Sequence, residues 1–429
     1  EAGWDLIVID EAHHLAWEPD AVSPEYALAQ ALTERVPGAI LLTATPEQLG
    51  LGGHFARLRL LDPARYRDLA AFEAETARFV ALSGTVEKLL DGVTLDQADA
   101  AALGALLGED AALLPDLLVR IANGDAAATQ RLVDILIDRH GTGRVMIRNR
   151  RAAVGGFPAR VRHAREIVVD DGDPALQGRL LAEFLADVEA PGHLEPTHDY
   201  SRDPRLDWLV ERIDTLAPQK VLVLCRSRAK VQALEDALRT RSGVALARFH
   251  EDMNLLQRDR NAAYFAQPDG ARLLIASEIG AEGRNFQFAQ HLLLWDLPMD
   301  PDMLEQRIGR LDRIGQRGDV NIHVAAVPGS AQEVLLRWYD EGLDAFTRVC
   351  ADGRELMRLF AERLLALVTD YGPGEAREAA FQQVLEDTRR EHARLIELIA
   401  HGRDRLLELA SRRGAEQSLL RDALARDDR

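Results

Sequence analysis

Lysine is nearly absent from this chain of 429 residues, which contains only Lys88, Lys220 and Lys230. None of the three follows a glycine. The Gly-Lys-Ser or Gly-Lys-Thr sequence of an ATP-phosphate loop therefore does not occur in these residues, because that loop needs its lysine directly after a glycine. Arginine supplies almost all of the positive charge, and the net charge is −18. This balance excludes a protein that coats nucleic acid through bulk attraction, although it is compatible with a local basic track.

Cysteine and long apolar runs are equally scarce. The two cysteines, Cys225 and Cys350, have no paired spacing, so the sequence indicates neither a disulfide framework nor a thiolate zinc site. No apolar run approaches the roughly 20 residues that cross a bilayer, and residues 1–4 (Glu-Ala-Gly-Trp) are not a basic signal peptide. The composition, 47% apolar and 28% charged, is that of a globular protein with about two to four domains. We expect a cytoplasmic protein with no membrane partner.

Residues 1–63 have the pattern of a doubly wound parallel sheet, an α/β fold. A buried strand is predicted over 4–9, a helix over about 12–35 and a second buried strand over 39–42. Polar segments follow both strands directly. We expect this region to be the carboxyl-terminal part of a truncated lobe, because the strands that normally come before it are missing.

Four regions follow. Residues 64–160 are predicted to be a helical insertion, because they are rich in Ala and Leu with helical periodicity as far as about residue 140. Residues 141–168 are basic and can form strands. The prolines within 161–204 predict a linker. Strands and helices alternate over 205–330, which predicts a second doubly wound parallel sheet. Residues 331–429 predict a helical extension. The strands expected in the second sheet are 220–224, 244–249, 272–276, 291–295 and 320–325.

An acidic pair, Asp10-Glu11, stands at the end of the first predicted strand, two residues before His13. Hydrolysis of ATP requires a metal ion near the β- and γ-phosphates and a water aligned with the bond that breaks. Asp10 can hold Mg²⁺ through a water molecule, and Glu11 can orient and deprotonate the attacking water. The alternative is an acidic helix start without a catalytic role, because Asp and Glu favour the first turn of a helix.

Two loops carry weaker signals. Thr43 and Thr45 close the second strand, where their hydroxyl groups can hydrogen-bond neighbouring loops or simply form a turn before a proline. Residues 280–285 (Gly-Ala-Glu-Gly-Arg-Asn) follow a strand, and glycines such as Gly283 allow the backbone to approach a phosphate. Glycine-rich loops are common, so neither loop is specific by itself.

The segment 306–316 (Gln-Arg-Ile-Gly-Arg-Leu-Asp-Arg-Ile-Gly-Gln) is the richest in candidate residues. Arg310 and Arg313 are three residues apart, so on a helix both side chains project from one face. Two guanidinium groups on one face can clamp the charge that develops on a γ-phosphate. The alternative is a solvated, arginine-rich helix end, which the apolar helix before this segment and Gly315-Gln316 within it disfavour.

The order of these motifs resembles that of superfamily-two helicases. Asp-Glu-Ala-His (10–13), Thr-Ala-Thr-Pro (43–46), Gly-Arg-Asn (283–285) and Arg-x-x-Arg-Ile-Gly-Gln (310–316) occur in helicase order, and the last is similar to that of Swi/Snf-type translocases. Longer segments are similar to the bacterial RapA (HepA) family of RNA polymerase-associated ATPases. Trp-Asp-Leu-Ile-Val-Ile-Asp-Glu-Ala-His-His-Leu begins at residue 4, and Ser-Glu-Ile-Gly-Ala-Glu-Gly-Arg-Asn-Phe-Gln-Phe-Ala begins at residue 277. Further similar segments extend the resemblance over nearly the whole chain.

The resemblance implies a fold and a set of residue roles. It implies two RecA-like lobes, 1–63 and 205–330, a Swi/Snf-type insertion at 64–160, and the start of a spacer domain within 331–429. Asp10 would bind Mg²⁺, Glu11 would activate water, and Arg310 and Arg313 would be arginine fingers. The nucleotide site would further include His13, Gly283 and Gln306, while Thr43, Thr45 and Asn285 would couple it to nucleic acid.

The function implied by the resemblance is that of an ATP-dependent double-stranded nucleic-acid translocase that remodels or recycles RNA polymerase complexes. ATP and Mg²⁺ would bind between the lobes, whose closing and opening would move a monomeric protein along DNA, with RNA as a second candidate. Because the phosphate loop is missing, we expect the 429 residues alone to be inactive. One alternative is a catalytically inactive protein-binding scaffold, which the intact acidic pair and both arginines disfavour. The other is an RNA helicase, which the Arg-Ile-Gly-Gln ending disfavours.

Overall fold

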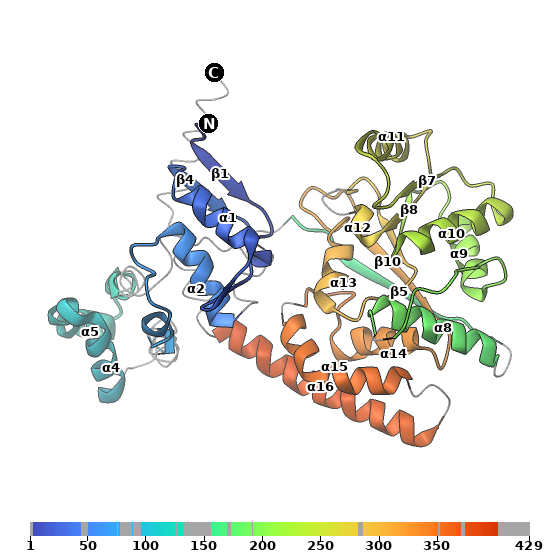
Figure 1. Ribbon diagram of the computed structural model, residues 1–429. Coiled ribbons are helices and arrows are strands. Elements are labelled where there is room, and N and C mark those ends of the chain that lie inside the picture. The colour runs from blue at the N-terminus through green and yellow to red at the C-terminus, as the bar shows by residue number, and fades with distance from the viewer. Residues whose placement is uncertain are drawn as a thin grey trace. The chain divides into compact units, whose positions relative to one another are not determined.

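The computed structural model describes residues 3–43, 50–74, 76–77, 88, 96–125, 127–132, 135, 156–169, 173–190, 192–281, 286–350, 352–369 and 374–401. The chain divides into two compact units (Figure 1), of which the first comprises Glu1–Ala153 with Glu397–Arg429 and the second Val154–Ile396. Each unit is described by itself. Among the described residues, no helix is long and apolar enough to cross a membrane.

The described part of the first unit contains a two-stranded parallel sheet. β1 (Leu6–Ile9) pairs with β4 (Gly38–Leu41). A 3-10 turn, η1 (Ala12–His14), and a short hairpin of β2 (Trp17–Glu18) and β3 (Ala21–Val22) stand where the sequence predicted the start of a helix. That helix, α1 (Pro24–Thr33), begins only after Ser23, whose side chain accepts a hydrogen bond from the Tyr26 amide at 3.1 Å. The Ser-Pro pair sets this start, because serine caps a helix and proline suits its first turn.

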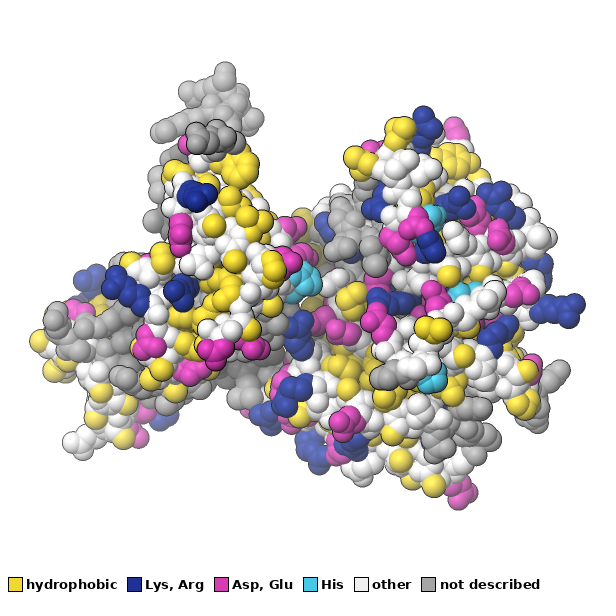
Figure 2. Space-filling model, in the orientation of Figure 1, with side chains coloured by type: hydrophobic (Ala, Val, Ile, Leu, Met, Phe, Trp, Pro, Cys, Tyr) yellow, Lys and Arg dark blue, Asp and Glu magenta, His cyan; other side chains and the backbone are white. Residues whose placement is uncertain are grey.

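The two strands of the first unit are not buried, contrary to the prediction. Leu6, Val8 and Ile40 are 52%, 54% and 44% exposed, and the register places Val8 beside Ile40 on one open face. The space-filling view shows hydrophobic side chains on the surface of this unit (Figure 2). Ile9 and Leu41, on the other face, pack against α1 and α2 (Gly50–Leu61). A strand in a doubly wound sheet is buried only when helices cover both faces, and the described helices of this unit cover one.

The described residues between the first sheet and β5 are helical. α4 (Gln97–Leu107), a 3-10 segment η2 (Gly108–Leu113) and α5 (Leu114–Ala122) follow one another. Leucines of α4 and α5 are buried, as the Ala/Leu-rich periodicity predicts. Between 64 and 159, the described residues contain no strand.

The second unit, in which Figure 1 labels β5, β7, β8 and β10, is built on a parallel sheet. Its six strands have the order β5-β10-β9-β6-β8-β7. The predicted doubly wound sheet is confirmed, and each predicted strand is found with its bounds shifted by a residue or two. The strands are β5 (Arg160–Glu166), β6 (Val221–Cys225), β7 (Leu246–Phe249), β8 (Leu273–Ser277), β9 (His291–Leu294) and β10 (Val320–Ala326). The helices within this region are α9 (Pro204–Thr215), α10 (Arg228–Arg241), α11 (Leu255–Ala266), α12 (Glu278–Ala281) and α13 (Pro301–Ile308).

Both faces of this second sheet are covered. Along β6, Leu222 and Leu224 belong to one hydrophobic cluster, while Val221 and Val223 belong to another on the opposite face. Every residue of β6 and β8 is buried. This explains why these strands read as continuous apolar runs in the sequence.

The predicted linker 161–204 is wrong over 161–187, whereas the described residues between 188 and 203 form no helix or strand. β5 pairs along its seven residues with β10 at the edge of the sheet, and α8 (Pro174–Asp187) buries Leu176, Leu180 and Phe184. The sequence of β5, Arg-Val-Arg-His-Ala-Arg-Glu, does not look like a core strand because it lies at an edge, where charged side chains can face water.

The predicted helical extension is confirmed. α14 (Ala331–Arg337) continues into a π-helical turn (Trp338–Gly342), followed by α15 (Gly353–Thr369) and α16 (Glu375–His401). Trp338 and Phe360 pack into one of the hydrophobic clusters of the sheet, and the Trp338 indole donates a hydrogen bond to Thr388 at 3.1 Å. Residues 402–429 lie outside the described residues.

Candidate functional site

A tight turn after β1 carries the acidic pair. Glu11 adopts φ 50° and ψ 43°, a left-handed conformation that costs a non-glycine residue about 1–3 kcal/mol. Two hydrogen bonds hold the turn: the Glu11 amide donates to Asp10 Oδ1 at 2.9 Å, and the Ala12 amide donates to Leu42 O at 2.8 Å. Strain that is fixed by neighbouring hydrogen bonds is typical of functional sites. The turn is thereby tied to the end of β4.

His13 connects the acidic pair with the end of β4. Its side chain is buried, and its Nδ1 lies 3.1 Å from Glu11 Oε2 and 3.3 Å from Thr43 Oγ1. The structure therefore brings together Asp10, Glu11, His13 and Thr43, which the sequence singled out separately. Thr45 lies outside the described residues.

The chemistry of this site fits a magnesium ion. Asp10 and Glu11 are both exposed to solvent at the end of a strand. Mg²⁺ prefers carboxylate oxygens and keeps several water molecules, so an exposed carboxylate that binds it through water is a suitable partner.

In the second unit, Arg310 and Arg313 do not lie on a helix, so the argument from their spacing on one helical face was wrong. α13 ends at Ile308, with Gly309 as its C-cap. Beyond it, Arg310 O accepts a hydrogen bond from the Phe286 amide at 3.1 Å, and Arg313 Nε donates to Gly309 O at 3.0 Å. Arg310 is half-buried and Arg313 is exposed. Glycine interrupts the helix because it has a low helix propensity.

The end of this segment is fixed by Gly315 and Gln316. Gly315 has φ 89°, a conformation that other residues rarely adopt, and Gln316 Nε2 donates to Ala289 O at 2.9 Å and to Leu311 O at 3.2 Å. Gln306 is exposed on α13. Gly283 and Asn285 lie outside the described residues.

Arg307 is a buried residue of this region that sequence reasoning missed. Its Nη1 donates to Asp296 O at 2.7 Å and to Asp296 Oδ1 at 2.9 Å, while its Nε donates to Glu278 Oε1 at 3.1 Å. Asp296 and Glu278 follow β9 and β8. Arg307 therefore anchors α13 to the carboxyl edge of the sheet, where ligands of open α/β folds bind. Charged residues directly after buried strands were the signal that could have indicated this.

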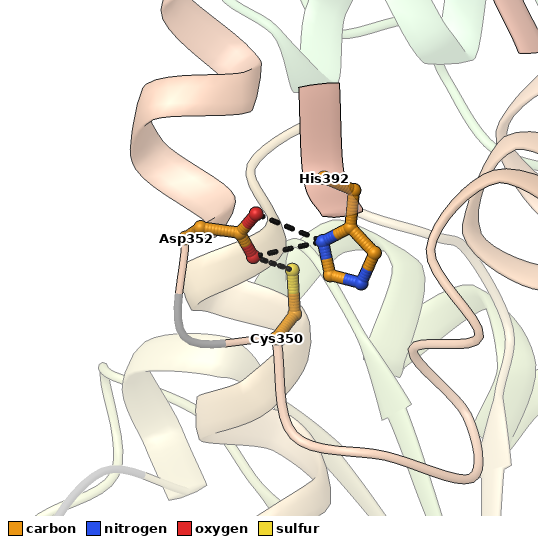
Figure 3. Close-up of side chains that lie close together, drawn as sticks. All are labelled: Cys350, Asp352 and His392. Atoms are coloured by element: carbon orange, nitrogen blue, oxygen red, sulfur yellow. Dashed lines mark hydrogen bonds and ion pairs between the residues drawn. The ribbon is translucent and has the colours of Figure 1, made fainter. Parts of the chain in front are cut away.

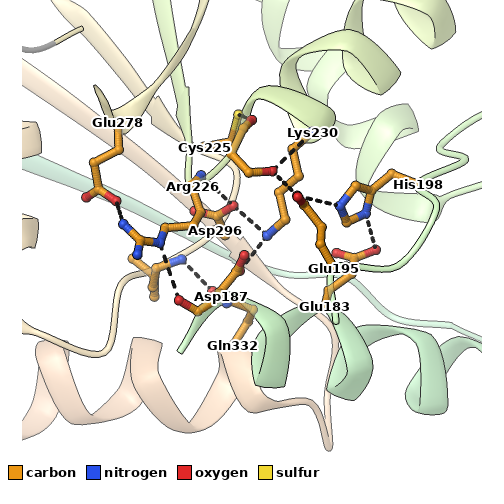
Figure 4. A network of polar contacts seen from close by, with 12 residues as sticks. Glu183, Asp187, Glu195, His198, Cys225, Arg226, Lys230, Glu278, Asp296 and Gln332 are labelled. Carbon is orange, nitrogen blue, oxygen red and sulfur yellow. Dashed lines mark hydrogen bonds and ion pairs between the residues drawn. The ribbon is translucent and has the colours of Figure 1, made fainter. Parts of the chain in front are cut away.

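Lys230 extends the same ionic network (Figure 4). It is 1% exposed, forms an ion pair with Asp187, and lies 2.9 Å from Asp296 Oδ2. Arg226 donates through its backbone amide to Asp296 Oδ2 at 3.0 Å and through Nη1 to Glu278 Oε2 at 2.8 Å. Burial pushes the pKa of Asp296 upward, but the Lys230 ammonium and the Arg307 guanidinium outweigh it and hold that pKa well below its usual range.

The pKa of Asp187 is shifted in the opposite direction to that of Asp296. Burial raises the pKa of its carboxyl, and the attraction of Lys230 offsets this only in part. The negative charge of Asp296 adds to the increase. Asp296 is thus the principal counter-ion of both buried cations, and the strand ends are held together around it.

Two family models match the chain. Residues 204–315 match the helicase conserved C-terminal domain, and residues 319–429 match the C-terminal region of the RNA polymerase recycling family. A solved SWI2/SNF2 ATPase core of Sulfolobus solfataricus in complex with double-stranded DNA has 15% sequence identity and a TM-score of 0.32, covering 87% of this chain and 74% of that chain.

Two relatives have much higher sequence identity to the chain, and the identity extends over all of its residues. The RNA polymerase-associated protein RapA of Pseudomonas fluorescens is 48% identical over 432 residues, which cover 100% of this chain and 45% of that protein. RapA of Stutzerimonas stutzeri is 47% identical over 432 residues, with the same coverage. The chain thus spans less than half the length of these relatives. Because the identity extends over all of its residues, the chain belongs to the RapA family.

Proposed function

We propose that the protein is a nucleic-acid-dependent ATPase that translocates on double-stranded DNA and remodels or recycles RNA polymerase complexes. The observation that carries this proposal is the strained turn of Asp10 and Glu11, which His13 connects to Thr43. An exposed acidic pair held in this way at a strand end is suited to hydrolysis of a phosphoanhydride. The names of the RapA relatives support RNA polymerase as the partner.

In this mechanism, each residue of the turn has a separate task. Asp10 would hold Mg²⁺ through water, and the ion would neutralise charge on the phosphates. The Glu11 carboxylate would orient the attacking water and accept its proton. His13 would couple Glu11 to the loop at Thr43 and Thr45, since its Nδ1 lies within reach of both Glu11 and Thr43.

Two arginines of the second unit would supply positive charge in the hydrolysis of ATP. Arg310 and Arg313 would act as arginine fingers that stabilise the charge developing on the γ-phosphate. The buried Arg307 would position them, because it fixes the helix from which their segment continues. We assign nucleotide sensing to Gln306, nucleotide binding to Gly283, coupling to nucleic acid to Asn285, and a monomeric state to the protein.

The test uses a version of the protein extended to the length of its relatives. We expect its ATPase rate to rise with double-stranded DNA. Glu11→Gln should lower turnover by about 10²-fold or more while leaving ATP binding nearly intact, because only the water-activating group is lost. The matched control is Glu18→Gln, an exposed carboxylate on β2 of the same unit. If Glu11→Gln stays within about threefold of the parent, Glu11 does not activate the water.

The chain of 429 residues alone should not hydrolyse ATP, because its sequence contains no Gly-Lys-Ser or Gly-Lys-Thr. DNA-stimulated phosphate release by this chain would contradict that expectation. An extended protein that binds RNA polymerase but shows no ATPase activity would instead identify a scaffold. Separation of RNA duplexes by the extended protein would identify a helicase.

A further inference from the structure

Three side chains that can ligate a metal meet in the second unit, where the start of α15 lies against α16 (Figure 3). Cys350 Sγ donates a hydrogen bond to Asp352 Oδ1 at 3.6 Å. His392 Nδ1 lies 2.8 Å from Asp352 Oδ2 and 3.1 Å from Oδ1. A ligand atom from each residue lies within 4.8 Å of the other two. They come from a loop, the start of one helix and the middle of another, so a bound ion would join three segments.

The distances from Asp352 to its two neighbours are close to those around a tetrahedral zinc ion. Bond lengths of about 2.3 Å to sulfur and about 2.0 Å to nitrogen or oxygen place neighbouring ligand atoms about 3.3–3.5 Å apart. The distance of 3.6 Å from Cys350 Sγ to Asp352 Oδ1 matches this value. His392 Nδ1 lies 3.1 Å from Asp352 Oδ1, slightly closer than the separation expected around zinc. The two atoms would need to move apart by about a few tenths of an ångström.

The surroundings also favour a cation. Cys350 and Asp352 are buried, and His392 is half-buried. Glu305 accepts a hydrogen bond from the Cys350 amide at 3.1 Å, and the Arg160 guanidinium is paired with Glu305. Two carboxylates, those of Asp352 and Glu305, therefore lie beside Cys350, and carboxylates attract a cation.

We propose that Cys350, Asp352 and His392 bind Zn²⁺, with water in the fourth position, and that the ion fastens α16 to the start of α15. On binding, the zinc–sulfur bond forms as the thiol proton leaves to solvent, and the imidazole binds through Nδ1 with its proton on Nε2. A thiolate, an imidazole and a carboxylate are the donor types that zinc uses in proteins. The spacing of the cysteines could not indicate this site, because only one of its ligands is a cysteine.

The first experiment is a titration of the metal-free 429-residue chain with Co²⁺, used as a spectroscopic substitute for Zn²⁺. We expect one equivalent to bind with a thiolate-to-cobalt charge-transfer absorption, which excess Zn²⁺ abolishes. Cys350→Ser should remove the absorption, and His392→Gln should weaken binding at least about tenfold. The matched control is Cys225→Ala, because Cys225 is the other cysteine and lies at the end of β6. It should leave the absorption unchanged.

A second experiment needs no variant and therefore does not depend on whether the substitutions disturb folding. Adding Zn²⁺ to the metal-free parent should raise its melting temperature and slow amide exchange around residue 392 in α16, and a chelator should reverse both effects. Failure of the parent to bind one equivalent of Co²⁺ or Zn²⁺ overturns the proposal. Absorption that persists in Cys350→Ser, or that is lost in Cys225→Ala, overturns it equally.

Discussion

The two parallel sheets of this chain show how differently similar strand sequences can be used. β1 is an apolar run in the sequence, yet Val8 is 54% exposed. β6 is also an apolar run, and Val223 is fully buried in the hydrophobic cluster on one face of its sheet, while another cluster covers the opposite face. An apolar run therefore predicts a strand, but its burial depends on what covers each face of the sheet.

The charged residues of the two units also differ in burial. Asp10 and Glu11 are exposed in the first unit and are held mainly by the backbone of their turn. In the second unit, Arg307 and Lys230 are buried in an ionic network, whereas Arg313 lies outside it and is exposed. This comparison separates residues that can reach a ligand from residues that maintain the fold.

Removing Arg310 or Arg313 should give the largest effect, and that effect should be a loss of ATPase turnover. In the extended protein, Arg310→Ala and Arg313→Ala should each lower turnover by roughly 10³-fold. Arg→Lys should restore little, because an ammonium group cannot reproduce the planar guanidinium. The first measurement is the steady-state ATPase rate at saturating DNA. The second is DNA binding as a function of salt, and the DNA affinity should barely change. If both variants keep near-parental ATPase rates but lose DNA affinity, the two arginines bind nucleic acid and do not act on ATP.

Removing a residue inside the network should reduce stability. Lys230→Met should cost about 3–5 kcal/mol of unfolding free energy, because Asp187 and Asp296 would remain buried without their cation. Hydrogen–deuterium exchange of β6 and β9 as a function of urea measures this in the second unit. The control is Lys220→Met, since Lys220 donates to two carbonyl oxygens nearer the surface, and its loss should cost about 1 kcal/mol. Equal costs for both lysines would show that the network is not needed for stability.

The sequence predicted more of the fold than of the network. Five strands of the second sheet were located because alternating apolar runs and helices have a clear pattern. β5 lies in sequence that was identified as able to form strands, but most of it was assigned to a linker because it is a charged edge strand. The acidic pair was found because its residues are adjacent in the chain. Arg307 was missed because its partners Glu278 and Asp296 lie 29 and 11 residues away, and only the sheet brings them together.

A buried histidine of the second sheet should make its stability dependent on pH. Burial, with the neighbouring His163 and His291, lowers the pKa of His323 to about 3. Between about pH 6.5 and pH 3, the unfolded chain binds a proton that the folded chain does not, so stability falls as the pH falls. Between pH 7 and pH 5 this contributes a loss of about 2 kcal/mol.

His323→Gln should remove that contribution, so the stability of the variant should decrease less than that of the parent over this interval. Urea denaturation at the two pH values measures the difference. The exposed His193 provides the control, and His193→Gln should keep the parental dependence on pH. The same loss in His323→Gln as in the parent would show that another group causes the acid sensitivity.

The smallest change in stability should come from a substitution on the open face of the first sheet. It tests directly whether the two sheets differ in burial. Val8→Thr should change the unfolding free energy by no more than about 0.5 kcal/mol, because the added hydroxyl remains in contact with water. The same substitution at Val223 should cost about 1–3 kcal/mol, because it buries a hydroxyl group between two apolar layers. Hydrogen–deuterium exchange of β1 and β6 reads the two sheets separately. An equal cost at both positions would show that the outer face of β1 is covered in solution, by another part of the protein or by a second copy. Binding of an apolar dye, which should fall in the Val8→Thr, Ile40→Thr double variant, distinguishes an open face from a covered one.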